Sequence, residues 1–472
     1  MAYPRITKLK TPEQFSARLD ELGISIPFDP EMDHQKTSLG KPFDLQGKSV
    51  GNRFAILPME GWDGTPDGKP TDLTRRRWRN FGISGAKLIW GGEAIAVNHA
   101  GRANPNQLLL NENNLSDIAS LRELLVTEHQ ETFGQIDDLH IGLQLTHSGR
   151  FACPNHRTQP EPKTIYAHPV LDQKFEIEAG SSILTDDDLK NLIEHFIAAA
   201  ILAERAGFHF VDIKHCHGYL GHELLSGFDR DGSFGGTFEN RTRFLREITS
   251  GIQAETKLQI GTRISIFDFA PFQKGSQGIG EPVQANYYTH AFGGDGSGRG
   301  IDLAEPDQFL SLLNKIGVPL VCTTAGSPYY NPHIQRPALF PPSDGYHPPE
   351  DPLVGVARQI NQTAEMKKKH PDLVIVGSAY SYLQEWIPHV GQKIISNQMA
   401  DFIGLGRMAL SYPEMPADLL SGKALYRKKI CRTFSDCTTA PRNGMVSGCF
   451  PLDPFYRSLP EHDALKAAKK SG

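Results

Sequence analysis

Short apolar runs alternate with amphipathic segments along most of this chain, and this alternation restricts its fold more than any other feature. Eight runs of four to six residues are apolar enough to be strands that are buried on both faces, as in a parallel sheet covered by helices. The runs are Arg53–Pro58, Lys87–Trp90, His140–Leu145, Phe208–Ile213, Leu258–Arg263, Pro319–Thr323, Leu373–Val376 and Asp401–Leu405.

Segments with apolar residues at helical spacing separate most of these runs. Eight strand–helix units with right-handed crossovers predict an α/β fold, the (β/α)8 TIM barrel. A doubly wound fold with two domains is the alternative, but no G-x-G-x-x-G motif follows an early run and no linker divides the chain. The expected helices are Leu73–Gly82, Leu115–His129, Asp186–Ala206, Glu239–Ala254, Pro306–Ile316 and Leu353–Lys369.

The barrel is predicted to cover residues 43–425, between an N-terminal extension (1–42) and a C-terminal tail (426–472). The extension is polar, and Pro27 and Pro30 indicate an irregular segment that wraps the barrel. Two long stretches, 151–182 and 269–303, interrupt the alternation. Because loops of this length in compact domains are often lids or binding loops, we expect both at the same mouth of the barrel.

Charge and composition exclude several classes of function. The formal net charge is -5 with both signs scattered, which argues against nucleic acid and membrane surfaces as partners. The chain begins without a signal-peptide pattern and has no apolar run of about eighteen residues, so a cytoplasmic protein is expected. Six cysteines in a chain of 472 residues do not form a disulfide framework, and this agrees with a reducing compartment.

Proton-transfer groups gather directly after the fourth run. Lys214, His217 and Tyr219 follow Ile213 within six positions. Catalytic groups of barrels lie at the carboxyl ends of the strands, so these three side chains are candidate catalytic residues. His215 should point to the other side of the strand and have a structural role.

Several ordered motifs between Phe43 and Tyr412 resemble those of the old yellow enzymes, which are FMN-dependent NADH:flavin oxidoreductases. This family folds as a (β/α)8 barrel with FMN across the carboxyl ends of the strands, in agreement with the fold predicted above. The motifs are Asn52-Arg53 with Pro58-Met59, Gln144 to Arg150, His217-Gly218-Tyr219-Leu220, Gly235-Gly236 with Glu239-Asn240-Arg241, and Gly404-Leu405-Gly406-Arg407.

The resemblance assigns cofactor contacts to particular residues. The backbone around Pro58 and Met59, with Ala94, would lie along the flavin ring, and the Gln144 amide would pair with its pyrimidine edge. Arg263 would stabilise the negative charge that develops near flavin N1 and O2. The phosphate would lie on the backbone at Gly377, Ser378, Gly406 and Arg407.

The resemblance also implies a mechanism and partners. NADH or NADPH would deliver a hydride to FMN, and a small electron-poor acceptor such as an α,β-unsaturated carbonyl compound would then receive it. His217 would donate a hydrogen bond to the acceptor's oxygen, and Tyr219 would protonate its α carbon. Relatives are frequently dimers, which implies a homodimer.

Lys214 and Glu60 depart from the family pattern. Lys214 stands where many relatives have histidine, and its ammonium group favours oxyanions over cationic amines. Glu60 follows Met59 close to the expected flavin, where an unpaired carboxylate would disfavour the electron-rich ring. We therefore expect Glu60 to be paired, protonated or turned away, with Lys214 as a candidate partner.

The C-terminal cysteines are a third departure. Larger relatives hold a [4Fe–4S] cluster on four cysteines, but this chain supplies Cys431, Cys437 and Cys449 and has Phe434 in place of the missing ligand. Three thiolates leave the cluster one ligand short, so no cluster is expected.

Two other functions remain open from the sequence. One is an FMN-dependent amine or betaine dehydrogenase or demethylase. The other is a barrel enzyme of another kind, such as a metal-dependent aldolase or hydrolase.

Overall fold

The computed structural model describes residues 3–178, 180–283 and 287–471. Within them, eight parallel strands follow one another around a closed barrel, because the first strand pairs with both the second and the last. The predicted (β/α)8 barrel is therefore confirmed. The strands are β3 (Phe54–Ile56), β4 (Leu88–Ile89), β6 (His140–Thr146), β7 (Phe210–Ile213), β8 (Gln259–Ser265), β11 (Leu320–Thr324), β12 (Val374–Gly377) and β13 (Phe402–Leu405).

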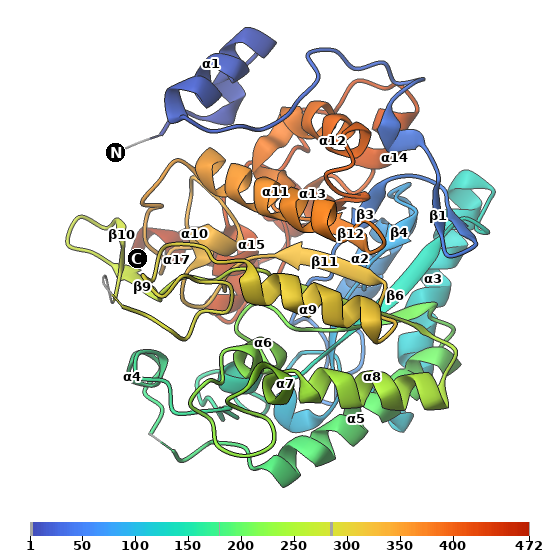
Figure 1. Cartoon of the computed structure of the whole chain (residues 1–472). Coiled ribbons are helices and arrows are strands. Elements are labelled where there is room, and N and C mark those ends of the chain that lie inside the picture. Colours follow the sequence, from blue (N-terminus) through green and yellow to red (C-terminus); the bar gives the residue numbers. More distant parts are fainter. Residues whose placement is uncertain (1–2, 179, 284–286, 472) are drawn as a thin grey trace.

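Helices cover the outside of this barrel (Figure 1). The predicted helix Glu239–Ala254 is divided at Thr242 into α7 (Phe238–Arg241) and α8 (Arg243–Glu255). The other five predicted helices agree with the structure to within four residues at each end. A further helix, α12, was not predicted. These helices are α2 (Asp72–Gly82), α3 (Leu115–Phe133), α5 (Asp186–Arg205), α9 (Ala304–Lys315), α11 (Pro352–Lys369) and α12 (Ile387–Ser396).

Large side chains fill the barrel interior. Trp90, Phe210 and Phe402 belong to one buried cluster inside the strands. Leu45 and Val50 belong to the same cluster, and they come from an antiparallel hairpin of β1 (Phe43–Leu45) and β2 (Lys48–Val50). The hairpin therefore closes the N-terminal end of the barrel and leaves the carboxyl end for a site.

The N-terminal extension contacts the outside of the barrel, and the prediction that it is irregular was wrong. It contains helix α1 (Pro12–Leu22), which Thr11 caps at its start and Gly23, at φ 63°, ends. The ring of Phe15 stacks on Trp386, with 4.4 Å between ring centroids. This contact fixes the extension to the outer layer near α12.

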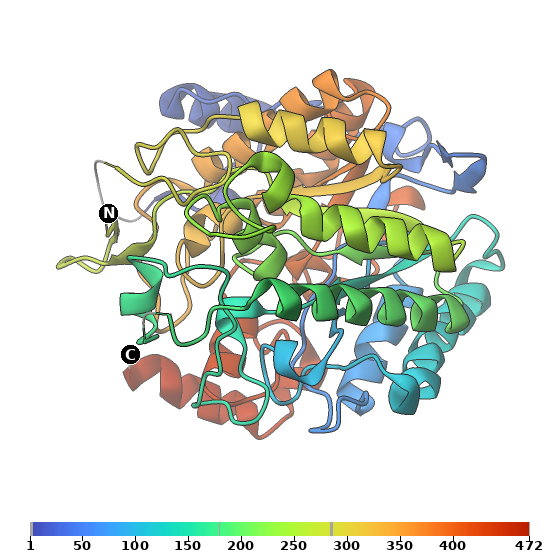
Figure 2. The ribbon, with the colours of Figure 1, turned by 60° about the horizontal axis from the view of Figure 1, so that its bottom comes forward.

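The long loops and the C-terminal tail gather at the carboxyl end of the strands (Figures 1 and 2). Short elements shape them: α4 (Leu171–Lys174) in the first loop, a hairpin of β9 (Phe272–Lys274) and β10 (Gly280–Pro282) in the second, and α15 (Asp436–Arg442) and α17 (Glu461–Ser471) in the tail. The loops touch each other, since His168 Nε2 lies 2.8 Å from Tyr288 Oη. Both loops therefore lie at one mouth, as predicted, except for positions 179 and 284–286, which lie outside the described residues. In the described part of the chain, no helix is both long and apolar enough to cross a membrane.

Candidate active site

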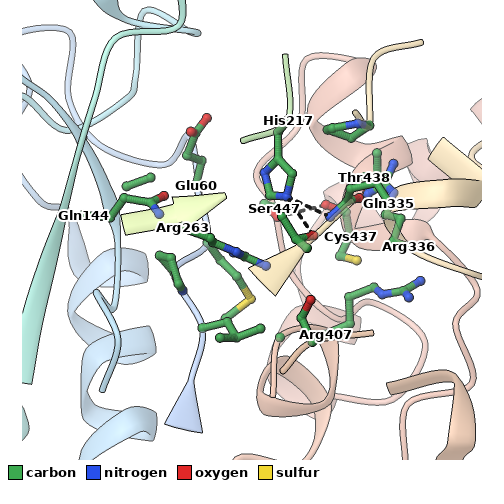
Figure 3. A pocket seen from close by; sticks show the side chains of 18 of the residues that line it. Glu60, Gln144, His217, Arg263, Gln335, Arg336, Arg407, Cys437, Thr438 and Ser447 are labelled. Atoms are coloured by element: carbon green, nitrogen blue, oxygen red, sulfur yellow. Dashed lines mark hydrogen bonds between the residues drawn. The ribbon is translucent and has the colours of Figure 1, made fainter. Parts of the chain in front are cut away.

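A cavity of about 260 Å³ opens at the carboxyl end of the barrel (Figure 3). All but one of the predicted site residues line it, although they come from seven separate parts of the chain; the exception is Gly377. The lining residues are Pro58, Met59, Glu60, Ala94, Gln144, Lys214, His217, Tyr219, Arg263, Ser378, Gly406 and Arg407. Gly377 ends β12 next to the lining residue Ser378. As predicted, His215 does not face the cavity, and its Nδ1 lies 2.9 Å from the carbonyl oxygen of Ile213.

A buried carboxylate below the cavity orients one of these residues. Asp212 Oδ2 accepts hydrogen bonds from Gln144 Nε2 (2.6 Å) and Trp90 Nε1 (2.7 Å), and Oδ1 accepts one from the backbone amide of Arg263 (2.7 Å). Burial raises the pKa of Asp212. Because the Gln144 amide nitrogen is engaged by Asp212, its oxygen is left to accept a hydrogen bond from a molecule in the cavity.

The Arg263 side chain enters the cavity. The residue is 6% exposed, and among the residues that the structure describes its buried Nε has no hydrogen-bond acceptor. Figure 3 shows the guanidinium pointing into the open space. A buried cation without an acceptor is costly unless a ligand supplies one, so this residue indicates an electron-rich ligand.

Glu60 joins three groups at one wall of the cavity. Its Oε1 lies 3.0 Å from Lys214 Nζ, and its Oε2 accepts hydrogen bonds from Tyr219 Oη (2.7 Å) and Trp62 Nε1 (3.0 Å). The ammonium group of Lys214 also lies 3.7 Å from the centroid of the Tyr219 ring. The predicted pairing of Glu60 with Lys214 is thus confirmed.

A buried ion network holds the segment that carries Glu60. Arg77 on α2 contacts Asp63 Oδ2 at 2.6 Å and Glu93 Oε2 at 2.7 Å, and the backbone amide of Gly61 donates to Glu93 Oε1 at 2.8 Å. A side chain at position 61 would collide with the Arg77 guanidinium, since a Cβ there would lie 2.2 Å from Nη2. Glycine therefore allows the network to approach the backbone next to Glu60.

His217 has a left-handed backbone, with φ 69°, and faces the cavity. Its Nε2 lies 3.3 Å from Gln335 Nε2 and 3.4 Å from Thr324 Oγ1. Burial, together with the nearby charges of Arg263 and Lys214, lowers the pKa of His217 well below its usual range. The imidazole is therefore neutral at neutral pH and can donate one N–H to a ligand.

Cations dominate the end of the cavity formed by β12 and β13. Nη1 of Arg407 and Nη2 of Arg336 are both buried, and neither has a partner among the described residues. A Cβ built on Gly406 would meet no atom within 4 Å, which shows that the backbone there faces open space. The Ser378 hydroxyl donates to the Thr323 carbonyl at 2.7 Å, so only its backbone remains for a ligand. This end can bind an anion such as a phosphate.

The C-terminal tail forms a wall that the sequence did not predict. Cys437, Thr438, Pro441, Arg442 and Ser447 line the cavity, whereas none of the described residues of the two long loops does. Arg336 donates a hydrogen bond to Thr438 Oγ1, and Arg442 pairs with Asp344 at 2.8 Å. The tail is thus tied to the segment that follows β11.

Cys431, Cys437 and Cys449 line a second, much smaller cavity of about 20 Å³ behind this wall. Within the described ranges, no group of three or more histidine, cysteine or acidic side chains is placed to hold a metal ion.

Other site residues also escaped the sequence analysis. Asp212 was not singled out, although its position between the apolar residues Val211 and Ile213 of β7 was the available signal. Tyr329, Gln335 and Arg336 lie in a segment after β11 that has no motif.

Comparison with known proteins excludes one of the remaining classes. The family model of the NADH:flavin oxidoreductase / NADH oxidase family matches residues 38–297. The chain belongs to this family. It is an oxidoreductase, so the alternative of a metal-dependent aldolase or hydrolase is set aside.

An NADPH dehydrogenase of Bacillus pumilus is 26% identical over 387 residues, which cover 81% of this chain and 94% of that enzyme. Among solved structures, a 2-naphthoyl-CoA reductase has a TM-score of 0.65 at 17% identity, covering 89% of this chain and 57% of its own. Morphinone reductase in complex with tetrahydroNAD has a TM-score of 0.56 at 18% identity, covering 82% of this chain and 92% of its own. These structures are similar in fold.

The cavity fits the FMN that this family binds. Among the described residues, Arg263 offers a buried Nε without an acceptor, and Arg407 and Arg336 each offer one buried guanidinium nitrogen without a partner for a phosphate. Gln144 offers an oriented amide oxygen, and Gly406 leaves open space beside its backbone. These are the three kinds of contact that an electron-rich ring edge, a ring N–H and a phosphate require.

Proposed function

We propose that this family member reduces electron-poor alkenes conjugated to a carbonyl group, with FMN as cofactor and NADH or NADPH as reductant. FMN, when bound, accepts a hydride from the nicotinamide and passes it to the acceptor. The observation that carries the proposal is the placement of neutral His217 and the Tyr219 phenol in one cavity with the unpartnered Arg263 guanidinium.

His217 and Tyr219 would act on two atoms of the acceptor, its carbonyl oxygen and its α carbon. The N–H of His217 would donate a hydrogen bond to the carbonyl oxygen, where negative charge gathers as the β carbon is reduced. Tyr219 would then protonate the α carbon. Burial and the charge of Glu60 raise the pKa of Tyr219 well above its usual range, so the phenol carries its proton at neutral pH.

Oxidation of amines, the alternative function, fits the cavity less well. A cationic amine would need a carboxylate and an aromatic face, and Glu60 and Tyr219 offer such a pair at one wall of the cavity. The ammonium group of Lys214 already occupies that position, 3.0 Å from Glu60 and 3.7 Å from the ring centroid of Tyr219. A second cation would be repelled there.

Anaerobic titration of the FMN-loaded protein tests the proposal. NADH or NADPH should bleach the flavin absorbance, and cyclohexenone or a nitroalkene should restore it, whereas N-methylated amines should not bleach it. Tyr219→Phe should keep the bleaching step and slow reoxidation by cyclohexenone by about 10²-fold. Bleaching by the amines, with no response to either nicotinamide, would contradict the proposal.

We also propose a cytoplasmic homodimer that acts on small molecules and contacts neither nucleic acid nor membrane. The scattered charge and the lack of a disulfide framework support this environment. Light scattering on a sizing column would measure the mass of the assembly, and a mass near that of one chain would contradict the dimer.

A further inference from the structure

The proton of Tyr219 is already engaged by the protein. Its O–H donates to Glu60 Oε2 at 2.7 Å, and Tyr329 Oη lies 3.0 Å from the same phenol oxygen. To protonate an acceptor, Tyr219 must turn this proton toward the cavity. The phenolate that would then remain next to an ionised Glu60 is strongly disfavoured, because two negative charges would share a buried site.

Lys214 offers a way to avoid this charge repulsion. Its ammonium group lies 3.0 Å from Glu60 Oε1, on the carboxylate oxygen that Tyr219 does not use. The two oxygens of Glu60 therefore connect a proton donor with the phenol. Lys214 is 7% exposed and the Glu60 side chain 11%, so bulk water has little direct access to this path.

We propose that Lys214 and Glu60 form a proton relay that replaces the phenolic proton which Tyr219 gives to the acceptor. The Lys214 ammonium gives a proton to Glu60 Oε1, and the neutral carboxyl group then turns so that this same proton is given to Tyr219 Oη. Tyr219 gives its own proton to the α carbon of the acceptor. Lys214 ends as a neutral amine, Glu60 and Tyr219 return to their starting charges, and the carbanion becomes a C–H bond. Lys214 regains its proton from water after the product leaves. This relay rests on the proposed function, since it serves an acceptor that is protonated on carbon.

Replacement of Lys214 by arginine separates proton supply from positioning. Lys214→Arg keeps a positive charge for Glu60, but a guanidinium does not give up its proton in proteins. Lys214→Met removes both functions, and Glu60→Gln keeps an acceptor oxygen for Tyr219 but cannot carry a proton. Lys174→Arg is the matched control, because Lys174 Nζ donates to the carbonyl oxygen of Phe272, outside the cavity.

Each FMN-loaded variant would be reduced by NADPH in a stopped-flow instrument and then reoxidised by either cyclohexenone or ferricyanide, which takes electrons without needing a proton on carbon. Reoxidation by cyclohexenone should be about 10²-fold slower in the Lys214→Arg, Lys214→Met and Glu60→Gln variants. In these three variants the rate with cyclohexenone should therefore fall more than the rate of reduction by NADPH or of reoxidation by ferricyanide, whereas Lys174→Arg should keep all three rates within about threefold of the wild type, on the scale of a lost minor contact. Melting temperature and flavin content would verify folding, and a crystal structure of the Lys214→Arg variant would verify its contact with Glu60.

A Lys214→Arg variant that keeps the wild-type rate with cyclohexenone would overturn the relay and leave Lys214 as a positioning residue. If wild-type protein is not reduced by NADPH, or never reacts with an enone, the proposed function fails instead.

Discussion

Replacement of Arg263 by methionine should make the protein without FMN more stable and its binding of FMN weaker. The Arg263 residue is 6% exposed, and its Nε is buried without an acceptor among the described residues. A buried polar group without a partner costs about 1–3 kcal/mol. Methionine fills a similar volume without this cost, so the free energy of unfolding of the FMN-free protein should rise by that amount.

The same substitution should raise the dissociation constant of FMN. A hydrogen bond to a charged group contributes about 1.5–3 kcal/mol, which corresponds to about a 10- to 150-fold change in the dissociation constant. Urea unfolding of the FMN-free protein, followed by circular dichroism, would measure the first effect. Quenching of FMN fluorescence on binding would measure the second.

Arg150→Met is the matched control for a buried arginine whose charge is paired. Arg150 contacts both Asp172 and Glu223, and its side chain is fully buried. Removal of one partner from a buried ion network costs about 3–5 kcal/mol, so this variant should be less stable than the wild type. If Arg263→Met lowers the stability of the FMN-free protein as Arg150→Met does, the assignment of Arg263 as a residue kept for a ligand is refuted.

Two further predictions concern stability. Arg77→Met should lower the free energy of unfolding by about 3–5 kcal/mol, because Asp63 and Glu93 would remain buried without their cation. As a control, Arg79→Met removes a half-exposed ion pair with Glu128 and should change the free energy of unfolding by at most about 1 kcal/mol. Burial lowers the pKa of His140 to about 3, below its unfolded value near 6.5. The unfolded state therefore binds the extra proton first, and this residue should reduce stability by about 1.4 kcal/mol for each pH unit from 6.5 down to 3. Urea unfolding at several pH values should show a smaller slope in His140→Gln, and equal slopes would contradict the argument.

The barrel strands could be predicted because both of their faces are buried. Each predicted run contains an observed strand or most of one, since helices on the outside and packed side chains on the inside both require apolar residues. β5 (Ala94–Ala96) was missed because it is short and directly follows β4, without a helix between them. The helix α1 was missed although Thr11, Pro12 and Gly23 are ordinary signals of its two ends.

The candidate site was only partly predictable, for a different physical reason. Residues at strand ends reach the cavity through the barrel geometry, so Lys214 and His217 could be placed from their strand alone, whereas Arg263 was assigned from the family resemblance. The wall formed by the tail depends on contacts between segments about one hundred residues apart, such as Arg336 with Thr438. No local pattern encodes such a contact. Asp212 faces the barrel interior because its neighbours Val211 and Ile213 pack in a buried cluster other than the interior one that holds Phe210. A single polar residue in a short apolar run does not show from the sequence which partners it has inside the barrel.

The tail explains how a cavity wall can be built on a segment that resembles a cluster-binding region. Phe434 packs on Phe340, with 5.4 Å between ring centroids, and Ser435 Oγ donates to the carbonyl oxygen of Phe340 at 2.6 Å. Lys469 of α17 pairs with Asp436 at 2.6 Å, so the last helix holds the start of α15. These contacts come from the protein chain itself and place Cys437 and Thr438 at the cavity. These contacts hold the tail in place without a fourth cysteine ligand. The shape of the cavity therefore depends on how the C-terminal residues fold.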